Sequence, residues 1–109
     1  MANDNFRHQG LRQELVNVLL KKGIKNPAVL NAIGKIPRHL FMEKAFINFA
    51  YQDKAFPIGS DQTISHPYTV AFQSELLDIK PREKVLEVGT GSGYQTAVLL
   101  ELKAQVFTI

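Results

Sequence analysis

The sequence predicts an α/β fold in which amino-terminal helices precede the first strand, helix and strand of a doubly wound parallel sheet. Apolar residues recur at three- and four-residue spacing through much of the amino-terminal part, as in amphipathic helices. A short run rich in β-branched residues, Val85–Val88, then leads directly into three glycines. Beyond them Tyr94–Leu102 has a helical pattern, and Gln105–Ile109 is typical of a second strand. Parallel strands joined in this way direct their carboxyl ends to one crevice, where ligands bind.

Composition and charge indicate one small globular domain without a nucleic-acid or membrane partner. The chain has 109 residues, 45% hydrophobic and 21% charged, and no cysteine, which excludes disulfides and thiolate metal sites. Its net charge is +3, and the basic excess lies in residues 1–56, where only Lys21 and Lys22 are adjacent. This pattern is too mild for a nucleic-acid footprint. Met1–Asp4 lacks a signal-peptide pattern, and Val16–Leu20 is too short to span a bilayer, so we expect a soluble cytoplasmic protein.

Four helical segments are predicted before the glycines. They cover residues 6–22, 28–33 and 38–45 and a segment that begins at Pro67 and is broken by Lys80–Glu83. Gly23 closes the first, and Asn26 and Pro27 give the second an N-cap and a first-turn proline. Residues 48–59 are expected to form a loop or a short irregular strand.

Large apolar side chains in these segments are candidates for the core. Those expected to be buried are Leu40, Phe41, Phe46, Phe49 and Phe56. In the segment after Pro67, Phe72, Leu76 and Ile79 lie on one stripe of the predicted helix.

The glycine turn Gly89-x-Gly91-x-Gly93 is the strongest chemical signal. Glycines at alternate positions let the backbone approach a ligand and leave the N–H groups of the following helix beside it. Tyr94 stands where a dinucleotide-binding turn needs its third glycine, which argues against NAD, and no Gly-Lys-Ser/Thr follows to form a Walker A loop. Glu87 lies at the end of the strand, where a carboxylate favours a cationic or amino-bearing ligand over phosphate.

Four segments carry a resemblance to a known family. Glu87–Gly93 resembles the first motif of class I methyltransferases, Rossmann-like enzymes that bind S-adenosylmethionine. Ile36–Phe41, Ala50–Gly59 and Gln62–Pro67 are similar to segments of the protein-L-isoaspartate (D-aspartate) O-methyltransferase family. The resemblance implies an enzyme that moves a methyl group from S-adenosylmethionine to the carboxylate of an L-isoaspartyl or D-aspartyl residue in a damaged protein. The ester then closes to a succinimide that can reopen as aspartate, so the implied function is protein repair.

The resemblance also implies the site residues. Thr63–Ser65 would form a loop over the active site, with Ser65 at the position of the family's proposed catalytic serine. Cofactor contacts are expected from Gln62, Thr63, Ile64, Glu87, Gly89, Thr90, Gly91, Ser92 and Gly93. A carboxylate is ionised at pH 7, so orientation by a serine suffices, and neither a strong base nor a metal is expected. The expected products are the methyl ester and S-adenosylhomocysteine.

Some of these residues have a second interpretation. Ser65 could cap the helix that follows it, a role compatible with the first. Asp53 fits either a turn or a substrate-facing loop. Ser92 could face solvent, but its place between two glycines favours contact with the cofactor. His8 and His39 are expected to be surface or packing residues.

The carboxyl end of the chain gives a further expectation. In the family's fold a carboxylate that holds the ribose hydroxyls follows the second strand, and the chain ends there, at Thr108–Ile109. We therefore expect an amino-terminal portion of the enzyme, with residues 1–79 as a helical and active-site loop region and 80–109 as the incomplete start of the cofactor-binding domain. This portion alone is expected to bind cofactor weakly and to be inactive. The alternative is a noncatalytic module that self-associates, as a homo-oligomer or by domain swapping, through exposed strand edges.

Overall fold

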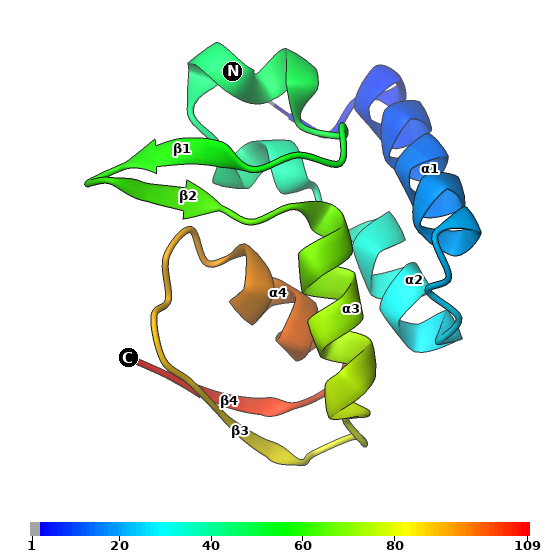
Figure 1. The fold of residues 1–109 in the computed structure, drawn as a ribbon, viewed down its shortest axis with the longest axis vertical. Coiled ribbons are helices and arrows are strands. Elements are labelled where there is room, and N and C mark those ends of the chain that lie inside the picture. The colour runs from blue at the N-terminus through cyan, green and yellow to red at the C-terminus, as the bar shows by residue number, and fades with distance from the viewer. Residues whose placement is uncertain (1–2) are drawn as a thin grey trace.

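The computed structural model describes residues 3–109 and contains, among them, four α-helices, two 3-10 helices and two separate two-stranded sheets (Figure 1). The helices are α1 (Phe6–Lys21), α2 (Pro27–Lys35), η1 (Arg38–Phe41), η2 (Lys44–Phe49), α3 (Pro67–Leu77) and α4 (Tyr94–Glu101). The strands are β1 (Phe56–Gly59), β2 (Gln62–Ile64), β3 (Lys84–Glu87) and β4 (Gln105–Thr108). Within residues 3–109, no helix is long and apolar enough to cross a membrane.

The predicted fold class is confirmed, because amino-terminal helices are followed by the strand–helix–strand unit β3–α4–β4. β3 and β4 pair in parallel, with Glu87 opposite Thr108 at their carboxyl ends. The Gly89 N–H extends this ladder by donating to the Ile109 carbonyl oxygen at 2.8 Å. Since both strands run in the same direction, their carboxyl ends meet beside the glycine turn, as the sequence predicts.

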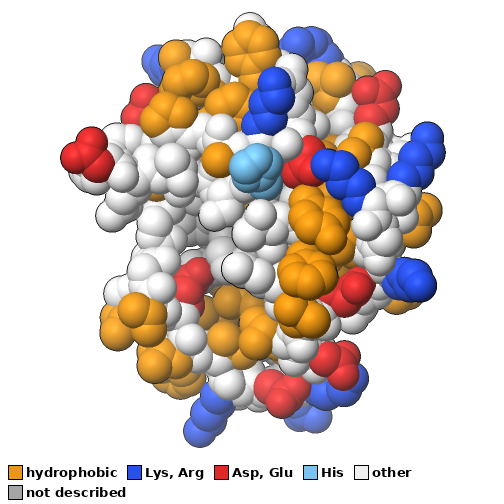
Figure 2. All heavy atoms as spheres, viewed as in Figure 1, with side chains coloured by type: hydrophobic (Ala, Val, Ile, Leu, Met, Phe, Trp, Pro, Cys, Tyr) orange, Lys and Arg blue, Asp and Glu red, His pale blue; other side chains and the backbone are white. Residues whose placement is uncertain are grey.

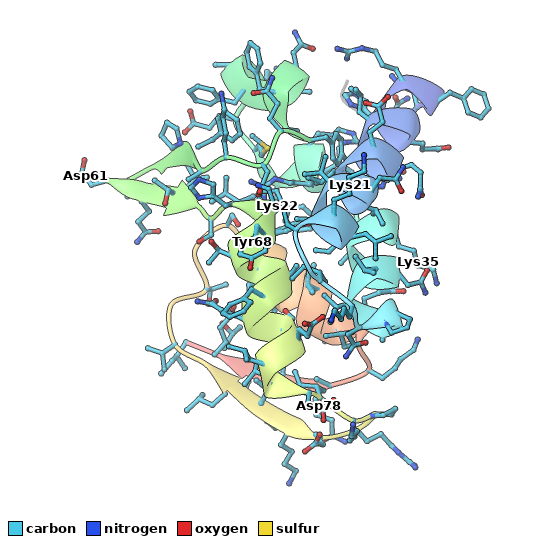
Figure 3. The ribbon with its side chains drawn as sticks, turned by 45° about the vertical axis from the view of Figure 1, so that its right-hand side comes forward. Lys21, Lys22, Lys35, Asp61, Tyr68 and Asp78 are labelled. Atoms are coloured by element: carbon cyan, nitrogen blue, oxygen red, sulfur yellow. The ribbon has the colours of Figure 1, made fainter. Side chains whose placement is uncertain are left out.

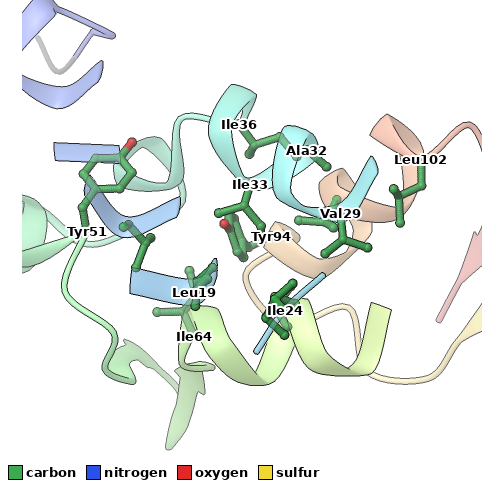
Figure 4. Packing of buried hydrophobic residues seen from close by; sticks show 14 of the residues in the cluster. Leu19, Ile24, Val29, Ala32, Ile33, Ile36, Tyr51, Ile64, Tyr94 and Leu102 are labelled. Carbon is green, nitrogen blue, oxygen red and sulfur yellow. The ribbon is translucent and has the colours of Figure 1, made fainter. Parts of the chain in front are cut away.

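One hydrophobic core joins the amino-terminal helices to α4 (Figure 4). Leu19 of α1, Ile33 of α2 and Ile64 of β2 are at most 2% exposed, and Tyr94 at the start of α4 is 1% exposed. Burial of apolar surface is the main favourable contribution to folding. The core therefore fixes α4, and with it the glycine turn, against the segment that carries Ser65.

The first two helices begin close to the predicted residues because their caps are local. The Asn5 side chain accepts the His8 N–H at 2.9 Å, and the Asn26 side chain accepts the Ala28 N–H at 2.9 Å. Pro27 occupies the first turn of α2, where its missing N–H removes no helical hydrogen bond. The first residues of α1 and α2 are thus predictable from residues adjacent in the sequence.

The third predicted helix is wrong, because the chain forms the two short 3-10 helices η1 and η2 in its place. Over so few residues, apolar spacing does not separate three residues per turn from 3.6. Leu40 and Phe49 are 50% and 46% exposed, which contradicts their prediction as core residues. Phe41 and Phe56 pack half-buried against the core, and Phe46 contacts the Phe56 ring at a centroid distance of 5.6 Å.

α3 exposes part of its apolar stripe. Phe72 is 43% and Leu76 is 69% exposed, whereas Ala71 and Ser74 are buried on a helix that contacts α2 and α4. The Ser74 hydroxyl accepts a hydrogen bond from Gln95 Nε2 of α4 at 3.0 Å. Small side chains on this face allow the helix axes to approach closely, and this selects the buried face over the stripe of larger residues.

β1 and β2 form an antiparallel hairpin whose register shifts between Pro57 and Gly59, so β1 is the short irregular strand expected at the end of residues 48–59. Ser60 and Asp61 make its turn with φ values of 54° and 57°, and Asp61 lies at the tip (Figure 3). Two left-handed residues match the right-handed twist of the paired strands. The hairpin leads directly into Ser65 and α3.

Candidate functional site

The turn between β3 and α4 contains three glycines in the left-handed region. Gly89, Gly91 and Gly93 have φ values of 90°, 55° and 85°, which residues with a Cβ rarely adopt. A Cβ placed on Gly89 or Gly91 would meet nothing within 4 Å. Backbone conformation, rather than crowding, therefore requires glycine at these two positions, and their backbone borders open space.

Glu87 is held at the sheet edge by hydroxyl groups from two other elements. Its Oε1 accepts hydrogen bonds from Thr96 Oγ1 of α4 and, at 2.8 Å, from Thr108 Oγ1 of β4. The Thr108 hydroxyl also lies 2.6 Å from the hydroxyl of Thr90 in the glycine turn. These contacts fix the carboxylate at the carboxyl ends of both strands.

The segment that carries Ser65 is anchored on both sides. Ile64 is 2% exposed in the core, and Arg38 Nη2 donates to the Ser65 carbonyl oxygen at 2.9 Å. The Ser65 side chain itself is exposed. The N-cap of α3 is His66, and no side chain at that position makes a capping hydrogen bond. The interpretation of Ser65 as the cap of α3 is therefore wrong, and its hydroxyl is left available.

Asp53 supplies the missing cap from a distant part of the chain. Its Oδ1 accepts the Tyr68 N–H in the first turn of α3 at 2.8 Å, and its Oδ2 forms an ion pair with Lys22. Lys22 Nζ lies 5.8 Å from the centroid of the Tyr68 ring (Figure 3). These contacts give Asp53 a structural role in holding the start of α3, beside Ser65.

A pocket of about 270 Å³ lies between the glycine turn and the Ser65 segment, and Figure 2 shows the molecule hollowed on its left side below the hairpin. Eight predicted site residues line it: Thr63, Ile64, Ser65, Glu87, Gly89, Thr90, Gly91 and Ser92. The predicted residues Gln62 and Gly93 do not line it. The structure thus places residues 63–65 and residues 87–92 around one pocket, an arrangement that in the sequence only the family resemblance implies.

Five lining residues were absent from the prediction. They are Val70, Gln73, Val88, Tyr94 and Gln95. Val88 lies inside the glycine motif, and Tyr94 and Gln95 follow it directly, so their position in the sequence was a usable signal. Val70 and Gln73 reach the pocket only through the packing of α3, which no local pattern specifies.

The pocket carries negative charge. Among the described residues that line it, Glu87 alone is charged. Burial raises the pKa of Tyr94 to about 12, so its hydroxyl is neutral at pH 7. A negative, partly enclosed site favours a ligand that carries positive charge. Residues 3–109 contain no group of three or more His, Asp or Glu side chains placed to hold a metal ion.

The two amino-terminal histidines pack in a separate buried cluster. The His8 and His39 rings stack with centroids 3.8 Å apart. His39 Nε2 lies 2.9 Å from the Asn3 carbonyl oxygen and must donate to it, so in the neutral ring Nδ1 accepts from the Tyr51 hydroxyl at 2.7 Å. Neither histidine lines the pocket, which agrees with their prediction as packing residues.

Comparison with known sequences identifies relatives along most of the chain. A sequence model of the protein-L-isoaspartate(D-aspartate) O-methyltransferase family matches residues 10–109. Curated proteins named protein-L-isoaspartate O-methyltransferase from Christiangramia forsetii and Flavobacterium johnsoniae are 70% and 65% identical over 106 residues. Each alignment covers 97% of this chain and 50% of the relative. The chain therefore spans about half the length of the curated relatives it matches.

Solved structures agree with these matches. A protein-L-isoaspartate O-methyltransferase superposes with a TM-score of 0.79 at 28% identity, covering 89% of this chain and 33% of the other. A Plasmodium falciparum protein described as the same kind of methyltransferase, in complex with S-adenosyl-L-homocysteine, gives 0.73 at 24% identity, covering 89% and 47%. At 24% identity, the second comparison shows only that the two folds are similar. Since the family match extends over nearly the whole sequence, the chain belongs to the protein-L-isoaspartate(D-aspartate) O-methyltransferase family.

Proposed function

We propose that this chain contributes the donor and acceptor pocket of a protein repair methyltransferase. The enzyme moves a methyl group from S-adenosylmethionine to the carboxylate of an L-isoaspartyl, or D-aspartyl, residue in a damaged protein. The observation that carries the proposal is that the glycine turn, Glu87 and Ser65 line the same pocket. Family membership supports the reaction, and the S-adenosyl-L-homocysteine complex of the Plasmodium falciparum neighbour supports the cofactor.

Glu87 and the glycine turn are the proposed contacts of the methyl donor. S-adenosylmethionine carries a sulfonium and an amino group, both positive, and the Glu87 carboxylate is the charge that faces the pocket. When bound, S-adenosylmethionine supplies a methyl group already activated for transfer. The proposed cofactor-binding residues are Gln62, Thr63, Ile64, Glu87, Gly89, Thr90, Gly91, Ser92 and Gly93.

Ser65 is the proposed contact of the acceptor. The acceptor carboxylate is ionised at pH 7, so the Ser65 hydroxyl or N–H holds it by donating a hydrogen bond and removes no proton. A carboxylate oxygen forms the new bond to the methyl carbon as the carbon–sulfur bond breaks, which leaves neutral S-adenosylhomocysteine and a methyl ester. Alignment of donor and acceptor is then the main source of rate.

In this proposal the two parts of the chain serve different substrates. Residues 1–79 form the helical region with the acceptor loop, and residues 80–109 begin the cofactor-binding domain. The acceptors are isoaspartyl-containing proteins and peptides in the cytoplasm, rather than nucleic acids or membranes.

A methyl-transfer assay tests the proposed function. It compares the 109-residue chain with a fusion in which the remaining half of the Christiangramia forsetii relative follows Ile109. We expect the fusion to label an isoaspartyl peptide and not the same peptide with normal aspartate, and the chain alone to show little transfer. In the fusion, Ser65→Ala should lower kcat by at least about tenfold, because one aligned hydrogen-bond donor is lost. A folded fusion that labels neither peptide would refute the proposal.

A second candidate function is self-association without catalysis, and the outer face of the β3–β4 sheet favours it. Leu86, Val88, Phe107 and Ile109 are 64%, 77%, 56% and 75% exposed there, and hydrophobic side chains gather at the lower left of Figure 2. Exposed apolar patches of this kind often mark interfaces. Methyl transfer by the fusion would exclude this candidate as the sole function.

A further inference from the structure

Arg38 is a fully buried cation without a carboxylate partner. Its side chain is 0% exposed, and no ion pair among residues 3–109 includes it. Burial lowers the pKa of Arg38, yet a guanidinium stays protonated at neutral pH. Burying an unpaired charge is unfavourable unless hydrogen bonds compensate for the lost water. Nε and Nη2 of Arg38 have such partners, whereas Nη1 has none among residues 3–109.

The donors of Arg38 bind three segments that are far apart in the sequence. Nε donates to the Ala50 carbonyl oxygen at 2.9 Å. Nη2 donates to the carbonyl oxygens of Lys54 at 3.1 Å and of Ser65 at 2.9 Å. A planar guanidinium presents its N–H groups in fixed directions, which the flexible ammonium of lysine does not. Ser65 is thus held by a rigid side chain that is itself fixed at two other points.

The same guanidinium lies over the ring of Tyr94, the first residue of α4. Arg38 Cζ lies 4.9 Å from the centroid of the Tyr94 ring, within the range of a cation–π contact. Tyr94 is the first residue of α4, follows Gly93 directly and lines the pocket. Arg38 therefore contacts both walls of the pocket from behind, at Ser65 on one side and at the end of the glycine turn on the other.

We propose that Arg38 is a positioning residue that sets the distance between acceptor and methyl donor. The inference rests on the proposed function, in which Ser65 holds the acceptor and the glycine turn holds the donor. Arg38 does not line the pocket, so it acts through these two elements. A displacement of about 1 Å between reacting groups can lower a rate by on the order of 100-fold. Donor binding uses the glycine turn and Glu87, so it should be far less sensitive to Arg38.

Arg38→Lys in the fusion enzyme tests this role, with Arg12→Lys as a matched control. Arg12 is also buried, at 5% exposure, and donates to the Gly34 carbonyl oxygen at 2.9 Å, but it does not line or back the pocket. In R38K we expect kcat with the isoaspartyl peptide to fall at least about tenfold, while KM for S-adenosylmethionine stays within about twofold. R12K should lower Tm and leave kcat within about twofold.

Two measurements guard against a variant that simply folds poorly. Arg38→Met keeps the length of the side chain and removes the buried charge, and it should show the same loss of kcat per folded molecule. Amide hydrogen exchange on the 109-residue chain should become faster at residues 63–66 in R38K and not in R12K. An R38K kcat within about twofold of the unsubstituted fusion, or an equal loss in R12K, would overturn this inference alone. No transfer by the unsubstituted fusion would overturn the proposed function and this inference together.

Discussion

Tyr94 belongs both to the core and to the pocket. It is 1% exposed, its ring contacts the Arg38 guanidinium, and its hydroxyl has no hydrogen-bond partner among residues 3–109. Burial in this environment disfavours the phenolate and raises the pKa of Tyr94 to about 12. The pocket wall formed by this residue is therefore uncharged over the physiological range of pH.

The raised pKa predicts a loss of stability in alkaline solution. The Tyr94 phenol loses its proton near pH 10 in the unfolded chain and near 12 in the fold. Between these pH values the folded state binds more protons than the unfolded state, so stability falls as pH rises. The contribution of the neutral Tyr94 phenol to stability is therefore complete below pH 10 and is lost as pH rises through 12. At pH 11, one unit above the unfolded pKa, the lost contribution is on the order of 1 kcal/mol. The free energy of unfolding, measured by denaturation at about pH 8 and about pH 11, should fall between these two pH values. Tyr94→Phe should remove most of this fall. The half-buried Tyr68, changed to Phe, is the control, and an unchanged pH dependence in Y94F would contradict the assignment.

Individual site residues differ in how far the sequence could reveal them. Glu87 and the three glycines belong to one short motif, so their local spacing was sufficient. Ser65 is proposed as an acceptor contact only through a resemblance, because nothing in the adjacent sequence distinguishes that role from a helix cap. Arg38 lies within the segment Ile36–Phe41, and the sequence predicts no role for it, since its contacts are with backbone oxygens of three distant segments.

Among the elements, α3 depends most clearly on a contact from outside itself. It begins with His66 and Pro67, neither of which supplies a side-chain cap, and Asp53 accepts the N–H of Tyr68 instead. An acceptor with negative charge at a helix N-terminus also interacts favourably with the helix dipole. The position of the Ser65 segment is therefore linked to the loop that contains Asp53.

Removal of this remote cap should destabilise the fold. Asp53→Ala should lower the free energy of unfolding by about 1 kcal/mol, because the first turn of α3 loses its acceptor. Asp53→Asn keeps an acceptor oxygen and should lose less. Lys22 is 48% exposed, so its ion pair contributes little, and Lys22→Met serves as the control in the same urea titrations. A loss in K22M as large as in D53A would assign the effect to the ion pair.

Elements with local start signals were predictable, and those defined by tertiary packing were not. Asn26 and Pro27 begin α2, and the glycine turn separates β3 from α4. The hairpin has Ser60 and Asp61 in left-handed conformations, a pair that is a weak turn signal compared with Asn-Gly. The buried face of α3 depends on which helices approach it, and its sequence is apolar on several sides.

The β3–β4 sheet is covered on only one of its two faces. α4 contacts β4, while the outer face presents the four apolar side chains at 86, 88, 107 and 109. Within the described part of the chain, β3 and β4 pair only with each other, so each strand has a free edge there. The chain spans about half the length of the curated relatives it matches.

The exposed face predicts self-association of the chain by itself. Sedimentation velocity of the 109-residue chain should show oligomers that increase with concentration. Phe107→Lys places a charge in the centre of the patch and should shift the population to monomer, whereas Phe6→Lys, on a residue 90% exposed at the start of α1, should not. A chain that remains monomeric at high concentration would show that the face is not an interface.

The position at which S-adenosylhomocysteine binds to this chain tests the proposed function most directly. Titration of the ¹⁵N-labelled chain with S-adenosylhomocysteine, followed by heteronuclear NMR, detects weak binding residue by residue. We predict the largest shifts in residues 62–65 and 87–95, with further shifts at Val70 and Gln73 of α3. Shifts centred elsewhere, such as the groove lined by Leu11, Leu15 and Tyr51, would contradict the proposed function.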